Sequence, residues 1–115
     1  MTVNGPAPRP GAGGEDDRME EWRRRIDAID DELLRLLNDR ARSAIEIGHI
    51  KRRLNLPVYS AEREAEILAR VSRANRGPLE AAAIRRLFER IIDESRSLER
   101  HAAQGPPPAG EGPEE

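Results

Sequence analysis

The stretch that decides the fold is residues 20–54, EEWRRRIDAIDDELLRLLNDRARSAIEIGHIKRRL. Its apolar residues recur every three or four positions, as they do on one face of an α-helix. They are Trp22, Ile26, Ile29, Leu33, Leu36, Leu37, Ala41, Ala44, Ile47, Ile50 and Leu54. No proline interrupts the stretch, and Gly48 weakens it by only ~1 kcal/mol relative to alanine. The pattern predicts one helix about 50 Å long.

Two breaks separate this helix from two shorter ones. Pro57 disfavours helix at the residue before it, and Ser60 suits the N-cap of a second helix over 61–74. In Gly77-Pro78 the glycine suits a helix C-cap, and the proline suits the start of a third helix over 79–101. The sequence therefore predicts an all-α fold with one long, one short and one medium helix.

Composition limits the size of the core. Residues 1–17 and 104–115 are rich in Gly, Pro and charge, and we expect two disordered tails around one helical domain over 18–103. A domain of roughly 85 residues is too small to cover the long helix alone. The apolar stripe of that helix is expected to pack against the same helix of a second subunit, which gives an intertwined helical homodimer.

Composition also excludes several classes of function. The net charge is −2, with 20 Lys and Arg against 22 Asp and Glu, so we expect no nucleic-acid partner. The chain has no cysteine, which excludes thiolate chemistry. With no signal peptide and no long apolar run, we expect a soluble cytoplasmic protein without membrane contact. No metal-ligand spacing, phosphate loop or Ser-His-Asp arrangement is evident, so neither a metal nor a cofactor is expected.

The functional signal is a set of polar residues on the apolar stripes. Arg40 and Lys51 are eleven positions apart, which is three helical turns, so they share one face of the long helix. Ser95 and Glu99 are four apart on the third helix and project together. Glu64 lies one turn before apolar residues of the second helix. These charges either form internal salt bridges or line a cavity that accepts a dianion.

Five stretches stand in the order and spacing of a known family. They are Arg23-x-x-Ile-Asp-x-Ile-Asp30, Leu33-Leu34-x-Leu-Leu37-x-x-Arg40, Ile47-Gly48-x-x-Lys51, Pro57-Val58-x-x-x-x-Arg63-Glu64 and Leu87-Phe88-x-x-Ile91-Ile92-x-x-Ser95. Together they resemble the all-helical class of chorismate mutase, including the mutase domain that is fused to prephenate dehydratase. Because the chain ends soon after the third helix, we expect no fused second enzyme.

The resemblance implies a homodimer with two active sites. It also implies which residues bind the substrate's carboxylates and its reacting ether oxygen. Arg23 would reach into the site of the other subunit and bind one carboxylate. Arg40 would bind the other carboxylate. Lys51 would donate to the ether oxygen whose bond to carbon breaks, and Glu99 would face the same oxygen.

Further roles implied by the resemblance concern the ring hydroxyl. Glu64 would accept a hydrogen bond from it, with Arg63 and Ser95 as supporting polar contacts to hydroxyl and carboxylate. Ser60 stands where several members of the family have Asp, which puts a hydroxyl-binding role for it in doubt.

The implied activity is the rearrangement of chorismate to prephenate in phenylalanine and tyrosine biosynthesis, an intramolecular reaction that needs no nucleophile or cofactor. Orientation and electrostatic stabilisation suffice for it. An ether oxygen only accepts hydrogen bonds, so Glu99 would have to be protonated to help. Two alternatives remain open: an isochorismate pyruvate-lyase or 4-amino-4-deoxychorismate mutase on the same scaffold, and a non-catalytic dimerisation module.

Overall fold

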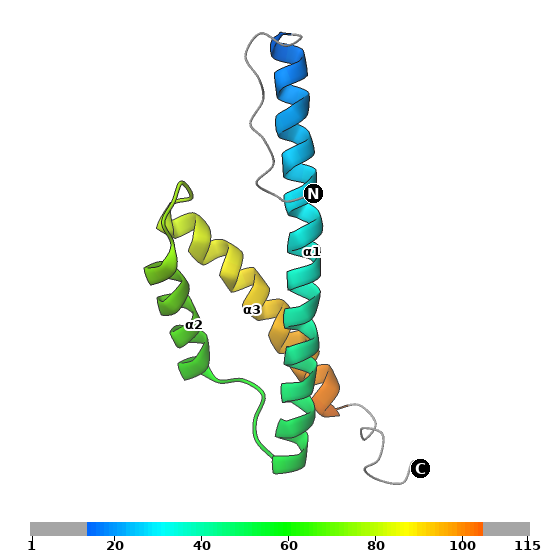
Figure 1. Cartoon of the computed structure of the whole chain (residues 1–115). Helices are drawn as coiled ribbons and strands as arrows, with labels where there is room; N and C mark the ends of the chain where they lie inside the picture. The colour runs from blue at the N-terminus through cyan, green and yellow to red at the C-terminus, as the bar shows by residue number, and fades with distance from the viewer. Residues whose placement is uncertain (1–13, 105–115) are drawn as a thin grey trace, which may run out of the picture. The chain divides into compact units, whose positions relative to one another are not determined.

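A computed structural model describes residues 14–104, and over that range the chain forms three α-helices and no strand (Figure 1). The all-α prediction of one long, one short and one medium helix is confirmed. The predicted N-terminal tail over 1–17 is wrong for its last three residues, which are helical, and Gln104 is helical as well. The rest of both predicted tails, 1–13 and 105–115, lies outside the described residues.

The first helix, α1, spans Glu15–Leu54 and begins five residues before the predicted start. Its first turn carries three acidic residues, Glu15, Asp16 and Asp17. Negative charge is favourable at a helix N-terminus, where backbone N–H groups lack partners. These charges explain why the helix extends beyond its apolar stripe.

The end of α1 is set by Asn55, which adopts a positive φ of 57°. The Leu56 N–H donates to the Lys51 carbonyl oxygen at 2.8 Å, and the Asn55 N–H donates to the Arg52 carbonyl oxygen at 3.2 Å. This pair of bonds is a Schellman motif, in which asparagine takes the place of the usual glycine. The helix therefore ends at Leu54, as predicted, and Asn55 stops it in place of Pro57, the residue that the sequence suggested as the break.

The second helix, α2, spans Ala61–Ala74, as predicted. The hydroxyl of Ser60 accepts a hydrogen bond from the Arg63 N–H at 3.1 Å, so Ser60 is its N-cap. The predicted C-cap, Gly77, is wrong because Asn75 holds that position. Asn75 orders the following turn through its side chain, which accepts from the Gly77 N–H and donates to the Leu79 carbonyl.

The third helix, α3, spans Ala81–Gln104 and begins two residues after the predicted start. Its first turn is closed by the Ile84 N–H, which donates to the Glu80 carbonyl oxygen at 3.0 Å. Pro78 therefore lies in the turn before the helix and not within its first turn. None of the helices described between residues 14 and 104 is long and apolar enough to cross a membrane.

The chain divides into two units at the Arg40–Ala41 bond, here called the N-terminal unit and the C-terminal unit. In the C-terminal unit α2 and α3 lie side by side (Figure 1). Each of the three helices contributes one buried apolar residue to this unit: Ala44, Ile67 and Ile92, each 5% to 6% exposed. The small core is therefore built from all three helices.

Candidate active site

An ion pair in the C-terminal unit joins the last turn of α1 to α3. The Lys51 ammonium donates to Oε1 of Glu99 at 2.9 Å and to the carbonyl oxygen of Val58 at 2.7 Å. The two charged side chains are only 20% and 16% exposed. Charges withdrawn from water to this degree are tolerated when they are paired and hydrogen-bonded. Lys51 and Glu99 are thus brought together, as donor and acceptor.

Gly48 lies one turn before Lys51 and allows α1 to approach α3 closely. A Cβ atom at this position would lie 2.6 Å from the Glu99 carbonyl oxygen and 2.9 Å from Cβ of Ala102. Any side chain here would push the two helices apart. The glycine that weakens α1 as an isolated helix is therefore what permits the Lys51–Glu99 contact.

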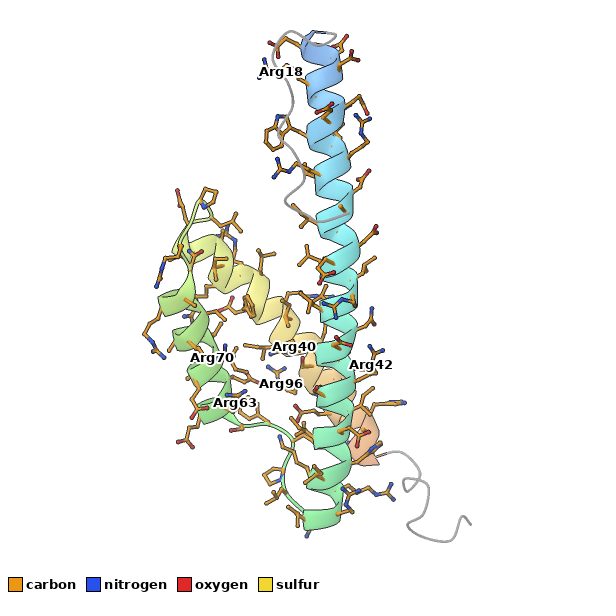
Figure 2. The ribbon with its side chains drawn as sticks, viewed as in Figure 1. Arg18, Arg40, Arg42, Arg63, Arg70 and Arg96 are labelled. Atoms are coloured by element: carbon orange, nitrogen blue, oxygen red, sulfur yellow. The ribbon has the colours of Figure 1, made fainter. Side chains whose placement is uncertain are left out.

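A second ion pair joins α3 to α2. Nε and Nη2 of Arg96 donate to the two carboxylate oxygens of Glu64 at 2.9 and 3.0 Å. The side chains are 26% and 23% exposed. Figure 2 shows Arg96 between α2 and α3. Two parallel bonds from a planar guanidinium fix both the position and the plane of a carboxylate.

Two further contacts hold the Arg96 guanidinium. Nη2 also donates to Asp93 at 3.1 Å, and Cζ lies 5.5 Å from the centroid of the Tyr59 ring. The hydrogen bond to Glu64 is the largest cause that raises the pKa of Arg96 above its usual value. Arg96 is therefore a fixed cation on the inner side of α3.

The N-terminus of α2 carries two more predicted site residues. Ser60 uses its hydroxyl as the helix cap, as described above. Arg63 is exposed and donates to Glu66 at 3.2 Å, an ion pair within one helical turn. In this structure Arg63 is therefore engaged along the outer surface of α2, and Ser60 has a structural role.

The remaining predicted residues lie on α1 and α3. Ser95 is partly buried on α3, one position before Arg96. Arg40 is partly buried and Arg23 is exposed, and both belong to the N-terminal unit. Nη1 of Arg23 donates to Oε2 of Glu20 at 3.0 Å, an ion pair within α1. Between residues 14 and 104, no cluster of three or more His, Cys, Asp or Glu side chains could hold a metal ion.

The sequence model of the family described as chorismate mutase type II matches residues 22–100 of the chain. The chain belongs to this family. The match contains every residue that the sequence resemblance singled out, from Arg23 to Glu99. The predicted resemblance to the all-helical chorismate mutases is thereby confirmed.

Relatives with curated names agree with this membership. The chain is 41% identical over 88 residues to the bifunctional chorismate mutase/prephenate dehydratase of Aquifex aeolicus (strain VF5), covering 73% of this chain and 24% of that protein. It is 41% identical over 85 residues to the protein of the same name from Neisseria gonorrhoeae (strain ATCC 700825 / FA 1090), covering 74% and 23%. The chain thus spans about a quarter of the length of these relatives.

Solved structures of this family are also similar to the chain. Chorismate mutase from Thermus thermophilus (form II) superposes with a TM-score of 0.70 at 40% sequence identity. The match covers 71% of this chain and 93% of that one. Form I of the same protein gives a TM-score of 0.67 and 98% coverage of its chain. The three-helix arrangement is therefore that of a chorismate mutase.

In this chorismate mutase type II chain, the sequence interpretation missed Arg96. A usable signal was present, because Arg96 lies one turn after Ile92, which is buried on the inner face of α3. A cation on an apolar stripe is the same anomaly that singled out Arg40 and Lys51. Its partner Glu64 was singled out from the sequence, but the contact between them depends on how α2 packs against α3.

Proposed function

We propose that this chain catalyses the rearrangement of chorismate to prephenate, in the cytoplasm and without a cofactor, as a step of phenylalanine and tyrosine biosynthesis. The observation that carries the proposal is the 40% identity across 93% of the Thermus thermophilus chorismate mutase chain. Membership of the chorismate mutase type II family over residues 22–100 supports it. The substrate would be a small dicarboxylate.

The proposed chemistry assigns the central role to Lys51. In the rearrangement an ether C–O bond breaks while a C–C bond forms, and negative charge grows on the ether oxygen. An ammonium group has three donors, of which the described residues Val58 and Glu99 use two. The third would donate to the ether oxygen. Because Lys51 is already held on two sides, it would need little reorganisation to stabilise that charge.

Glu99 is proposed to act as the second donor to the ether oxygen. When ionised it can only accept, as it does from Lys51 in this structure. In the substrate complex the carboxyl group would carry a proton and donate it in a hydrogen bond to the ether oxygen.

The proposed active unit is a homodimer. Apolar residues of the N-terminal unit recur at alternating steps of three and four, the pattern of a coiled-coil seam, and each is 42% to 55% exposed. They are Met19, Trp22, Ile26, Ile29, Leu33 and Leu36. We propose that these residues pack against the same seam of a second copy of the chain. Arg23 would then bind a substrate carboxylate in the second subunit's site.

The experiment that tests the function is to incubate the purified protein with chorismate and follow prephenate formation. Isochorismate and 4-amino-4-deoxychorismate, assayed in parallel, separate the alternatives that share two carboxylates. Turnover of one of these compounds but not of chorismate would reject the proposal. If none of the three compounds is turned over, the remaining interpretation is a non-catalytic dimerisation module.

Arg40→Met extends the test to the carboxylate site. We expect kcat/KM for chorismate to fall about a hundredfold, the usual loss when one charged contact to the transition state is removed. The dimer should persist, since methionine keeps most of the apolar stem of Arg40 and its packing. Arg42→Met is the matched control on an exposed position of α1 and should leave kcat/KM unchanged.

A further inference from the structure

We infer that Arg96 is a positioning residue that makes the ring-substituent position of the substrate selective for a neutral hydroxyl over a cationic amino group. The inference rests on the proposed function and on the role of Glu64 as hydrogen-bond acceptor for that substituent. The juxtaposition that carries it is the two-pronged contact between Arg96 and Glu64 across α2 and α3.

The contact with Arg96 fixes the orientation of the Glu64 carboxylate. Arg96 binds both oxygens of Glu64, at 2.9 and 3.0 Å, so the carboxylate cannot turn about its own axis. Each carboxylate oxygen offers two lone pairs, and one on each is used by Arg96. The other lone pair can still accept a hydrogen bond from a hydroxyl. Glu64 thus remains an acceptor, with its plane fixed by a residue that does not itself need to touch the substrate.

The charge of Arg96 changes which substituent the Glu64 carboxylate prefers to bind. A lone, mostly buried carboxylate would bind an ammonium group better than a hydroxyl, because opposite charges attract strongly away from water. Here the Glu64 charge is already balanced by Arg96, and both side chains are about three-quarters buried. An ammonium group at Glu64 would also face the Arg96 cation. Asp93 offsets little of this repulsion, because its side chain is 57% exposed and screened by water.

Three groups hold the Arg96 guanidinium in place. Its guanidinium is held by Glu64, by Asp93 and by the face of the Tyr59 ring 5.5 Å away. A cation held by three groups does not swing aside to admit an ammonium. The arrangement therefore favours chorismate over its analogue in which an amino group, protonated at neutral pH, replaces the ring hydroxyl.

The test measures KM for chorismate and the inhibition constant of 4-amino-4-deoxychorismate in wild-type, Arg96→Met and Arg96→Lys proteins. In the wild type we expect the amino compound to bind at least about tenfold more weakly than chorismate, the usual effect of one desolvated charge contact. Arg96→Met should remove most of this preference. Arg96→Lys keeps the charge but loses the fork, so it should retain the preference while KM for chorismate rises.

The matched control is Arg90→Met on the same helix, where Arg90 pairs with Glu94 in an exposed ion pair at 2.7 Å. It should leave the preference at the wild-type value. If Arg96 only holds α2 against α3, Arg96→Met should lower the melting temperature but keep the wild-type preference for chorismate. That result would overturn the inference. A wild-type protein that turns over neither compound would instead reject the proposed function, and the inference with it.

Discussion

The two units of the chain differ in where their ion pairs lie. In the N-terminal unit, pairs such as Arg23 with Glu20 and Arg35 with Glu32 join residues three positions apart on α1. The C-terminal unit also has pairs within one helix, but in addition Lys51 with Glu99 and Arg96 with Glu64 join different helices. Only the second kind of pair fixes tertiary structure.

The electrostatics of the two kinds of pair differ as well. Arg35 lowers the pKa of Glu32, first through a hydrogen bond and then through its charge, but both side chains are about half exposed. Such surface pairs contribute little to stability. The Arg96–Glu64 pair is mostly shielded from water, so losing one partner leaves a costly unpaired charge. The comparison teaches that the C-terminal unit is held by contacts between its helices, whereas the N-terminal unit exposes an apolar seam that the proposed dimer would cover.

Leu33→Lys, which would disrupt the proposed dimer of the N-terminal unit, should have the largest effect of the substitutions considered. Leu33 lies in the exposed apolar seam, and a dimer would place lysine against the seam of the second copy. Burying unpaired charge at two symmetry-related positions costs several kcal/mol, so the dimer dissociation constant should rise more than about a hundredfold. Sedimentation equilibrium measures this change.

The matched control for Leu33→Lys is Asp31→Lys, which adds a lysine to α1 outside the seam. It should leave the dissociation constant within a few-fold of the wild type. If both variants dimerise as the wild type does, the seam is not the interface, and the N-terminal unit is stabilised in some other way.

Gly48→Ala tests the C-terminal unit alone. Its Cβ would lie 2.6 Å from the Glu99 carbonyl oxygen, so α1 and α3 would have to separate. Overpacking of this kind costs about 1–3 kcal/mol, of which the better helix propensity of alanine recovers ~1 kcal/mol. Thermal and urea unfolding should show a net loss, larger for Gly48→Val. An increase in stability for Gly48→Ala would contradict the close approach of the two helices.

The Lys51–Glu99 pair can be probed by replacing its carboxylate. An ionised Glu99 only accepts hydrogen bonds, as it does from Lys51, whereas the amide of Glu99→Gln can donate to the ether oxygen without taking up a proton. We therefore expect kcat to be about tenfold higher for Glu99→Gln than for the wild type. Steady-state rates of the two proteins under the same conditions give the comparison. A kcat of Glu99→Gln at or below the wild-type value would reject the role of position 99 as a donor.

Ser60 is the site of the smallest expected effect. Ser60→Ala removes the N-cap of α2 and should lower the free energy of unfolding by about 1 kcal/mol. Ser60→Asp keeps a capping oxygen and should restore that stability. Urea unfolding of the two variants tests the capping role. A loss of chorismate turnover in Ser60→Ala that exceeds its loss of stability would return Ser60 to the substrate site.

Much of this fold could be read from periodicity and from local signals. The apolar spacing predicted all three helices, and Ser60 marked the start of α2 correctly. The last residues of α1 and α2, Leu54 and Ala74, were also predicted correctly. The residues that stop these helices were not, because Asn55 and Asn75 act through hydrogen bonds that depend on the turn that follows. Pro57 and Gly77 were the more obvious signals, and each lies two residues after the asparagine.

In the candidate site, the sequence singled out charged residues more readily than it paired them. Lys51, Glu64 and Glu99 stand out as charges on apolar stripes, and the structure partly buries all three. The family resemblance placed Lys51 and Glu99 at the same ether oxygen, but the partner of Glu64 could not be inferred, because it lies 32 positions away on another helix. Arg96 was overlooked for this reason, although its position one turn after Ile92 carried the same signal.

Lys51 also has a consequence for how this protein can change over time. Its backbone carbonyl closes the end of α1, and its ammonium group fastens the following loop at Val58. Catalytic groups commonly lower stability, so that their loss makes a protein more robust. At position 51 the side chain that holds this loop is the one that we propose for the chemistry. Inactive descendants that lose this lysine would therefore be less robust, not more, and purifying selection on the fold alone would tend to preserve it.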